Sequence, residues 1–245
     1  MKTSENSVNA WCRLPVLLAV AAMVLWQGVC AGSNVWQTSF DTPKPGALPK
    51  GWKLTGTSRG VPVASFTVVT NAAGSNILHM SAVKASAGIM CELKKMNLKK
   101  APIMRWRWRA LELATGADGR AEGKGDQPIH IYVISGSLMA QRCVSYTWET
   151  ETPRAATQSF SLFMGVFEDT WWCIRNKEDG TSVWFTEERD VAADFQKCYG
   201  FVPESVTVMI FCKADQTKTQ SAAELEWLAF ATEASATNAP RGTGK

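Results

Sequence analysis

The amino-acid sequence predicts an all-β fold, an antiparallel β-sandwich with one short helix. Short segments alternate apolar and polar residues, and clusters of Gly, Pro, Asn and Asp separate them, which is the pattern of half-buried strands joined by turns. So many short strands favour a sandwich over repeated βαβ units. The composition, 46% apolar and 20% charged, is typical of a globular domain and excludes a disordered chain. The expected strands are residues 66–70, 77–80, 89–93, 103–111, 129–135, 144–149, 160–166, 171–175, 183–187, 206–213 and 224–230.

The N-terminus predicts export. Residues 14–26 (LPVLLAVAAMVLW) form an uncharged apolar run that is shorter than the roughly 20 residues of a membrane span but suits the core of a signal peptide. Small residues around Ala31 predict cleavage there, so that residues 1–31 are a signal peptide and the protein is periplasmic or extracellular. A lipid anchor at Cys30 is a weaker alternative, because the residues before it fit an acylation motif poorly, and an uncleaved anchor ranks third.

Residues 32–231 are expected to form one β-sandwich domain. Its opening, residues 36–52, contains a Phe-Asp pair and a Pro-Lys-Gly-Trp turn, a combination typical of jelly-roll domains. The helix is expected to begin after Asp190 as its N-cap and to end at Gly200. Residues 232–245 are small and polar, which predicts a disordered C-terminal tail.

Charge and cysteine content limit the partners and cofactors. A net charge of +4 over 245 residues is too weak to indicate a nucleic-acid-binding protein. Beyond the signal segment the cysteines show no CxxC pair and no histidine at ligand spacing, so zinc is not predicted and their disulfide pairing stays open. No cofactor is expected; calcium is left open, although Asp41 and Asp215 are too isolated to indicate a site. The cysteines concerned are Cys91, Cys143, Cys173, Cys198 and Cys212.

Residues 103–110 (IMRWRWRA) carry the most distinctive pattern. On a strand, Arg105, Arg107 and Arg109 share one face, and the two tryptophans between them share the other. Such an arginine row can face a cleft and bind carboxylate, sulfate or phosphate groups. The alternative, which we favour, is a half-buried strand whose tryptophans enter the core and whose arginines pair with acids on neighbouring strands.

Two further strands carry side chains suited to a cleft. His130 and Tyr132 share a face of one strand, and Asp126 lies in the glycine-rich loop before it. Trp148 lies on the following strand with Tyr146 on the same face. A catalytic triad is not indicated, because the sequence has no Gly-x-Ser-x-Gly elbow. Glu187 and Glu188 are adjacent on a strand and so face opposite ways, which argues against a glycosidase pair.

Together these segments resemble a bacterial family of exported proteins known as domain of unknown function 3047. The matching residues are Trp106, Arg107, Trp108, Arg109, Asp126, His130, Tyr132, Tyr146, Trp148, Glu188, Arg189, Asp190, Asp194, Phe195, Asp215 and Thr217. His130 stands where the family usually has arginine, and Lys213 stands where it usually has an acid. The resemblance implies export and a jelly-roll sandwich similar to galactose-binding or concanavalin-like domains, but no established activity.

The function expected from these observations is non-catalytic binding of a cell-envelope glycan or polysaccharide. The expected ligand-binding residues share one concave face: Arg107, Arg109, His130, Tyr132 and Trp148, with Asp126 and Glu188 orienting the arginines. One alternative is a glycan-active hydrolase or lyase that uses His130 or Tyr132 as acid or base. The other is a structural envelope protein in which the arginines form internal ion pairs. A membrane is expected as a partner only through the N-terminal segment.

Overall fold

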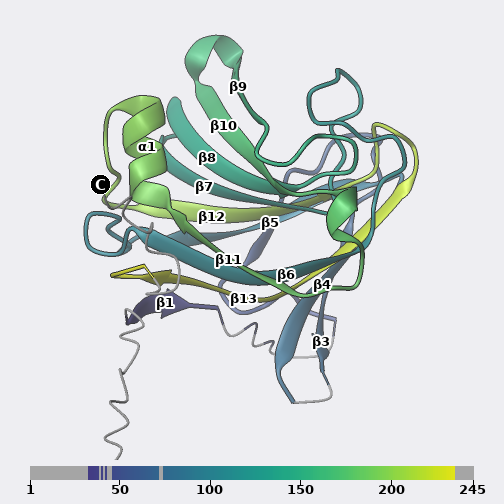
Figure 1. The fold of residues 1–245 in the computed structure, drawn as a ribbon, viewed down its shortest axis with the longest axis horizontal. Helices are drawn as coiled ribbons and strands as arrows, with labels where there is room; N and C mark the ends of the chain where they lie inside the picture. The colour runs from purple at the N-terminus through teal and green to yellow at the C-terminus, as the bar shows by residue number, and fades with distance from the viewer. Residues whose placement is uncertain (1–32, 39, 41, 43–45, 72–73, 235–245) are drawn as a thin grey trace, which may run out of the picture.

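The computed structural model describes residues 33–38, 40, 42, 46–71 and 74–234. The predicted signal segment 1–31, the alternative anchor at Cys30 and the tail beyond residue 234 lie outside these residues. Within them, two sheets pack face to face, as Figure 1 shows, and the predicted all-β jelly-roll sandwich is confirmed. No helix among the described residues is long and apolar enough to cross a membrane.

Sheet A is the lower layer in Figure 1 and has the strand order β11-β6-β13-β4-β3, with β1 also paired to β13. All its pairs are antiparallel. Its strands are β1 (Asn34–Gln37), β3 (Ser65–Thr70), β4 (Asn76–Val83), β6 (Ile103–Glu112), β11 (Phe185–Asp190) and β13 (Gln220–Ala231).

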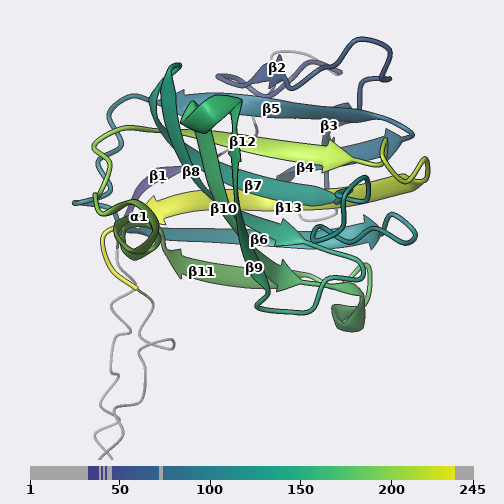
Figure 2. The ribbon, with the colours of Figure 1, turned by 90° about the horizontal axis from the view of Figure 1, so that it is seen from above.

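Sheet B is the upper layer and has the order β2-β5-β12-β7-β8-β10-β9. Its strands are β2 (Lys53–Thr55), β5 (Ser86–Leu93), β7 (Ile129–Ser137), β8 (Ala140–Trp148), β9 (Thr157–Leu162), β10 (Phe167–Arg175) and β12 (Val206–Lys213). In Figure 2, β9 and β10 run steeply across the direction of β5 and β12, so the sheet is strongly twisted. Figure 1 shows that this edge of sheet B curls upward, away from sheet A.

One strand pair departs from the predicted antiparallel arrangement. β10 pairs parallel to β8 on one side and antiparallel to β9 on the other. After β8 the chain passes outward to form β9 first, and β10 then returns through η1 (Phe163–Gly165) into the space between them. Because β9 runs opposite to β8, a strand that hairpins back from β9 must run parallel to β8.

The core confirms the strand alternation read from the sequence. Met104, Trp106 and Trp108 of β6 are fully buried between the sheets, and Ile129, Ile131 and Val133 of β7 face them from sheet B. Trp106 stacks on Tyr146 at 5.5 Å between ring centroids, and Trp108 meets Trp148 edge-on at 5.6 Å. The tryptophan-rich segments of the sequence therefore supply the centre of the sandwich.

The helix is also confirmed. α1 (Val191–Tyr199) begins after Asp190, whose carboxylate accepts a hydrogen bond from the Ala193 amide, and ends at Gly200, whose φ of 76° is left-handed. Val191 and Phe195 enter the core. A short 3-10 turn, η2 (Lys177–Asp179), lies between β10 and β11.

Candidate functional site

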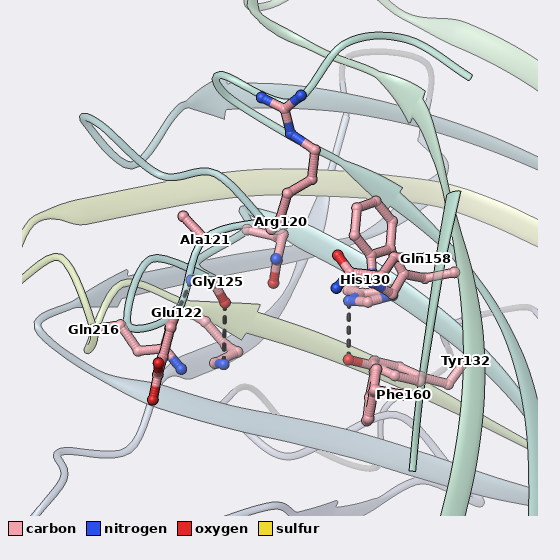
Figure 3. Close-up of a pocket in the computed structure, with 13 residues that line it drawn as sticks. Arg120, Ala121, Glu122, Gly125, His130, Tyr132, Gln158, Phe160 and Gln216 are labelled. Atoms are coloured by element: carbon pink, nitrogen blue, oxygen red, sulfur yellow. Dashed lines mark hydrogen bonds between the residues drawn. The ribbon is translucent and has the colours of Figure 1, made fainter. Parts of the chain in front are cut away.

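A pocket of about 370 Å³ lies on the open face of sheet B, the face turned away from sheet A (Figure 3). Strands β7, β9 and β10 supply one wall, and the loop between β6 and β7 supplies the other. Its lining combines aromatic rings with amide and charged side chains, which are the groups that orient a ligand in a small-molecule site. The lining residues are Gly119, Arg120, Ala121, Glu122, Gly125, Gln127, His130, Tyr132, Gln158, Phe160, Trp171, Lys213 and Gln216.

Three aromatic side chains form the strand wall. Strand alternation directs Tyr132, Phe160 and Trp171 to the open face, while Trp172, the next residue along β10, enters the core. Phe160 is 37% exposed, so its ring is available to a ligand.

The Tyr132 ring is held from both sides. It stacks on His130 with 4.0 Å between ring centroids, and Phe211 of β12 meets it edge-on at 6.0 Å. Phe211 occupies its place because the cross-strand neighbour is Gly88, where a Cβ atom would come within 2.5 Å of the Phe211 ring. The ring position of Tyr132 is therefore set by packing rather than by a ligand.

A buried carboxylate anchors the loop wall. Glu149, which is 1% exposed, accepts hydrogen bonds from the Gly119 amide at 3.0 Å, from Gln127 Nε2 at 3.1 Å and from Thr152 Oγ1 at 2.9 Å. Burial raises the pKa of Glu149, and these hydrogen bonds oppose that rise. Glu149 thus ties the β6–β7 loop to the end of β8 and places Gln127 at the pocket.

Asp126 holds the turn after β12 that forms part of the pocket rim. This fully buried carboxylate accepts hydrogen bonds from the Gln216 amide at 3.2 Å, the Thr217 amide at 2.6 Å and Thr217 Oγ1 at 2.8 Å. The turn that it holds carries the Gln216 side chain, which accepts a hydrogen bond from the Gly125 amide (Figure 3). Asp126 therefore positions a lining residue, and the expectation that it orients the arginine row is wrong.

The cationic groups of the pocket are Lys213 and Arg120. Lys213 Nζ donates to the Gly125 carbonyl at 3.1 Å. Arg120 pairs with Asp118 through two hydrogen bonds, at 2.9 and 2.7 Å, and this pairing holds the pKa of Asp118 well below its usual range. In Figure 3 the Arg120 guanidinium points away from His130, toward the outer rim.

The structure brings His130 and Tyr132 into this pocket but places the arginine row elsewhere. Trp106 and Trp108 point into the core, so Arg107 and Arg109, which alternate with them, lie on the outer face of sheet A. His130 and Tyr132 lie on the outer face of sheet B, on the other side of the sandwich. The prediction that all of these residues share one concave face is wrong, because β6 and β7 belong to different sheets.

The arginines pair with acids on neighbouring strands. Arg105 Nε lies 2.7 Å from Glu188 Oε2, Arg107 Nε lies 2.8 Å from Glu226 Oε2, and Arg109 Nη2 lies 2.6 Å from Glu224 Oε2. Trp184 covers Arg107 and Arg109. Its ring centroid lies 5.5 Å from the guanidinium carbon of Arg107 and 4.6 Å from that of Arg109. The ion-pair interpretation favoured from the sequence is the one that the geometry supports.

Trp148 is also absent from the pocket lining. Its ring is fully buried between the sheets against Trp108 and Phe185. Thr147, its neighbour on β8, takes the opposite face and bonds to Glu149 at 3.3 Å. The expectation that Trp148 binds the ligand is wrong, because the face of β8 that it shares with Tyr146 packs against sheet A.

Replacing Arg107 by Ala is expected to leave the affinity of the sheet B pocket for its ligand unchanged. Arg107 is 41% exposed and its ion pair is on the far sheet, so its loss should cost at most about 1 kcal/mol of unfolding free energy. Urea denaturation and a binding titration on the same sample measure both quantities. A loss of ligand binding without loss of stability would contradict this placement.

Several lining residues were not identified from the sequence. Gln158 and Phe160 come from a segment without a recognisable motif, and Arg120 lies in a loop. Lys213 and Gln216 lie in the segment that resembles the family near residues 213–217, but no binding role was expected of them. Trp171 carried a partial signal, because one of two consecutive tryptophans on a strand must leave the core.

Among the described residues, no cluster of His, Cys, Asp or Glu side chains has the arrangement of a metal site. The five cysteines whose pairing the sequence left open, Cys91, Cys143, Cys173, Cys198 and Cys212, are all free thiols.

The fold and the site define a jelly-roll β-sandwich domain with an aromatic and polar pocket on one open face. The chain belongs to the family described as protein of unknown function (DUF3047), whose model matches residues 50–228. No curated protein matches the chain in sequence.

Solved structures with related folds include a carbohydrate-binding module, a xyloglucanase and a lectin. A family 11 carbohydrate-binding module of Clostridium thermocellum is 12% identical, with a TM-score of 0.40 over 81% of this chain and 96% of that chain. A family 12 xyloglucanase from Bacillus licheniformis is 9% identical, with a TM-score of 0.41 over 80% of this chain and 100% of that chain. The winged bean acidic lectin is 8% identical, with a TM-score of 0.34 over 75% of this chain and 100% of that chain. Likenesses at this level carry no inference about ligand or activity.

Proposed function

We propose that the pocket on the open face of sheet B binds a glycan and that the protein is a non-catalytic binding domain. The observation that carries this proposal is the convergence of Tyr132, Phe160 and Trp171 with amide side chains in one open pocket. A sugar ring offers an apolar C–H face that packs on aromatic rings, and hydroxyl groups at its edge that bond to amides and charges. Gln158 and Gln216 supply donors and acceptors, and Lys213 supplies a charge.

The pocket lacks the arrangement of a two-carboxylate glycosidase. That chemistry needs two carboxyl groups on opposite sides of the scissile bond. Among the described lining residues Glu122 is the only carboxylic acid. The pocket geometry therefore favours binding over hydrolysis by paired carboxylates.

The decisive test is binding to a panel of envelope and plant glycans by wild-type protein and two phenylalanine variants. We expect wild type to bind at least one glycan and Phe160→Ala to weaken that binding about fivefold, because an aromatic contact contributes roughly 1 kcal/mol. Phe163→Ala is the matched control: Phe163 is 77% exposed on η1, and it is not among the lining residues.

Equal losses in the two variants would show that the panel signal does not come from the pocket. Absence of binding across the panel would overturn the proposal. Release of new reducing or unsaturated ends from any glycan would replace it with the enzymatic alternative.

We also propose that the protein is exported, on the strength of the apolar run at residues 14–26 and the small residues that follow it. Expression of the full chain in a bacterial host should yield a periplasmic or secreted protein whose N-terminus is Gly32. Intact-protein mass spectrometry distinguishes this product from an uncleaved chain and from one acylated at Cys30, either of which would contradict cleavage after Ala31.

A further inference from the structure

A continuous chain of hydrogen bonds leads from the pocket to a buried carboxyl group. Tyr132 Oη lies 2.9 Å from His130 Nδ1, and His130 Nε2 lies 2.9 Å from Ser145 Oγ (Figure 3 shows the first link). Ser145 Oγ is 2.9 Å from each carboxylate oxygen of Asp169. The four residues come from the adjacent strands β7, β8 and β10, and Asp169 is fully buried.

Each link holds a single proton, so the links must all point the same way. When Asp169 is ionised, Ser145 donates to it, and His130 Nε2–H donates to Ser145. His130 Nδ1 then has no hydrogen and accepts from the Tyr132 hydroxyl. In this state the Tyr132 oxygen can only accept a hydrogen bond from a ligand.

A proton on Asp169 allows every link to reverse. Asp169 then donates to Ser145, Ser145 donates to His130 Nε2, and His130 Nδ1–H donates to the Tyr132 oxygen. The phenolic hydrogen of Tyr132 is freed and can be donated into the pocket. No net charge moves onto His130 or Tyr132 in either state.

The surroundings favour a titration at Asp169 rather than at His130. Burial, together with the nearby Lys213 charge, lowers the pKa of His130 to about 3, so its ring stays neutral. Burial raises the pKa of Asp169 to about 7, against the opposing hydrogen bonds from Ser145 and Cys143. The remaining ionisable groups near Asp169 are Cys198 and Tyr199 of α1, while β9 contributes no ionisable side chain.

We propose that the proton on Asp169 decides whether Tyr132 donates or accepts a hydrogen bond at the pocket, and so couples glycan recognition to pH. The ligand part of this inference rests on the proposed function. The protonated state suits groups that only accept, such as the carboxylate of an acidic sugar. The Lys213 ammonium, which also lines the pocket, favours the same ligand class.

The four hydrogen-bonded residues Tyr132, His130, Ser145 and Asp169 form a relay. This relay is tested without a ligand, by nitrogen NMR of the histidine ring. The sequence has 2 histidines, so His79→Gln leaves His130 alone. We expect the ring hydrogen to move from Nε2 to Nδ1 as the pH falls through about 7. A single tautomer across this range, or an imidazolium ring in it, would overturn the relay.

Variants at Ser145 supply the matched control. Ser145→Ala breaks the chain and should leave His130 in one tautomer at every pH, whereas Ser145→Thr keeps the hydroxyl and should restore the change. Persistence of the tautomer change in Ser145→Ala would show that His130 responds to another group.

Binding of tetragalacturonate then tests the ligand step. Its affinity should fall as the pH rises from about 6 to about 8, by up to tenfold per unit for one linked proton, and Tyr132→Phe should remove that dependence. A tautomer change without binding of any glycan would contradict the proposed function but support the relay. Tetragalacturonate binding that does not vary with pH would overturn the coupling.

Discussion

Trp106→Ala is expected to lower the unfolding free energy by about 4 kcal/mol, among the largest losses available from a single side chain. Trp106 is fully buried between the sheets, stacked on Tyr146 and edge-on to Trp108 at 5.4 Å. Its removal leaves a cavity that aromatic neighbours on both sheets cannot fill without leaving their rotamers. Urea denaturation followed by tryptophan fluorescence measures the change.

Trp184→Ala is the control for this prediction. Trp184 lies on the outer face of sheet A, where it covers Arg107 and Arg109, and is only partly buried. Its loss should cost about 1 kcal/mol, the contribution of a partly exposed cation–π contact. If the two tryptophan variants lost equal stability, the placement of Trp106 at the centre of the core would be contradicted.

Replacing Asp169 and replacing His130 are expected to give the unfolding free energy opposite dependences on pH. The folded-state pKa of Asp169, about 7, lies above its ordinary value of 3.8, so its contribution to stability is fully present below about pH 4 and is lost as pH rises to about 7. The folded-state pKa of His130, about 3, lies below its ordinary value of 6.5, so its contribution is lost as pH falls from about 6.5 to about 3. In the wild type the two slopes oppose each other and nearly cancel between about pH 4 and 6.5.

A single substitution removes one contribution, so that the pH dependence of the unfolding free energy from the other group can be measured. Asp169→Asn leaves the histidine, and its stability should rise by about 1.4 kcal/mol per pH unit between about pH 4 and 6.5. His130→Gln leaves the carboxyl group, and its stability should fall by a similar amount per unit, to a total of about 4 kcal/mol near pH 7. Urea denaturation at several pH values in this window measures both, with Phe163→Ala as a variant that should follow the wild type. Slopes of the same sign in the two variants would contradict the burial of this pair.

The strand pattern could be predicted because it depends on neighbours in the chain. Alternation along β6 and β7 identified which side chains face the core, and Asp190 and Gly200 marked the ends of α1. Two short strands, β1 and β2, were not identified as separate strands, since segments of 4 and 3 residues carry too little alternation to be recognised. The parallel pairing of β10 with β8 also had no local signal, because register and direction depend on the partner strand.

The candidate site could be predicted only in part. His130 and Tyr132 were found because two polar aromatic residues share one face of an otherwise apolar strand. Asp169 and Ser145 were missed, since a buried polar residue on a strand is indistinguishable in sequence from an exposed one. Arg107 and Arg109 were assigned to the same cleft because alternation gives a face of a strand but not the sheet to which that strand belongs.

The sequence by itself determined the all-β class, the helix, the tryptophan core and the opposite faces of each strand, because these follow from period-two alternation and local capping. Only the tertiary structure decided which strands share a sheet, and thereby separated the arginine row of β6 from the pocket at β7. It also brought Asp169 within reach of His130 through Ser145. Contacts between residues far apart in sequence depend on how the two sheets assemble, and that assembly is set by packing across the whole core rather than by any single segment.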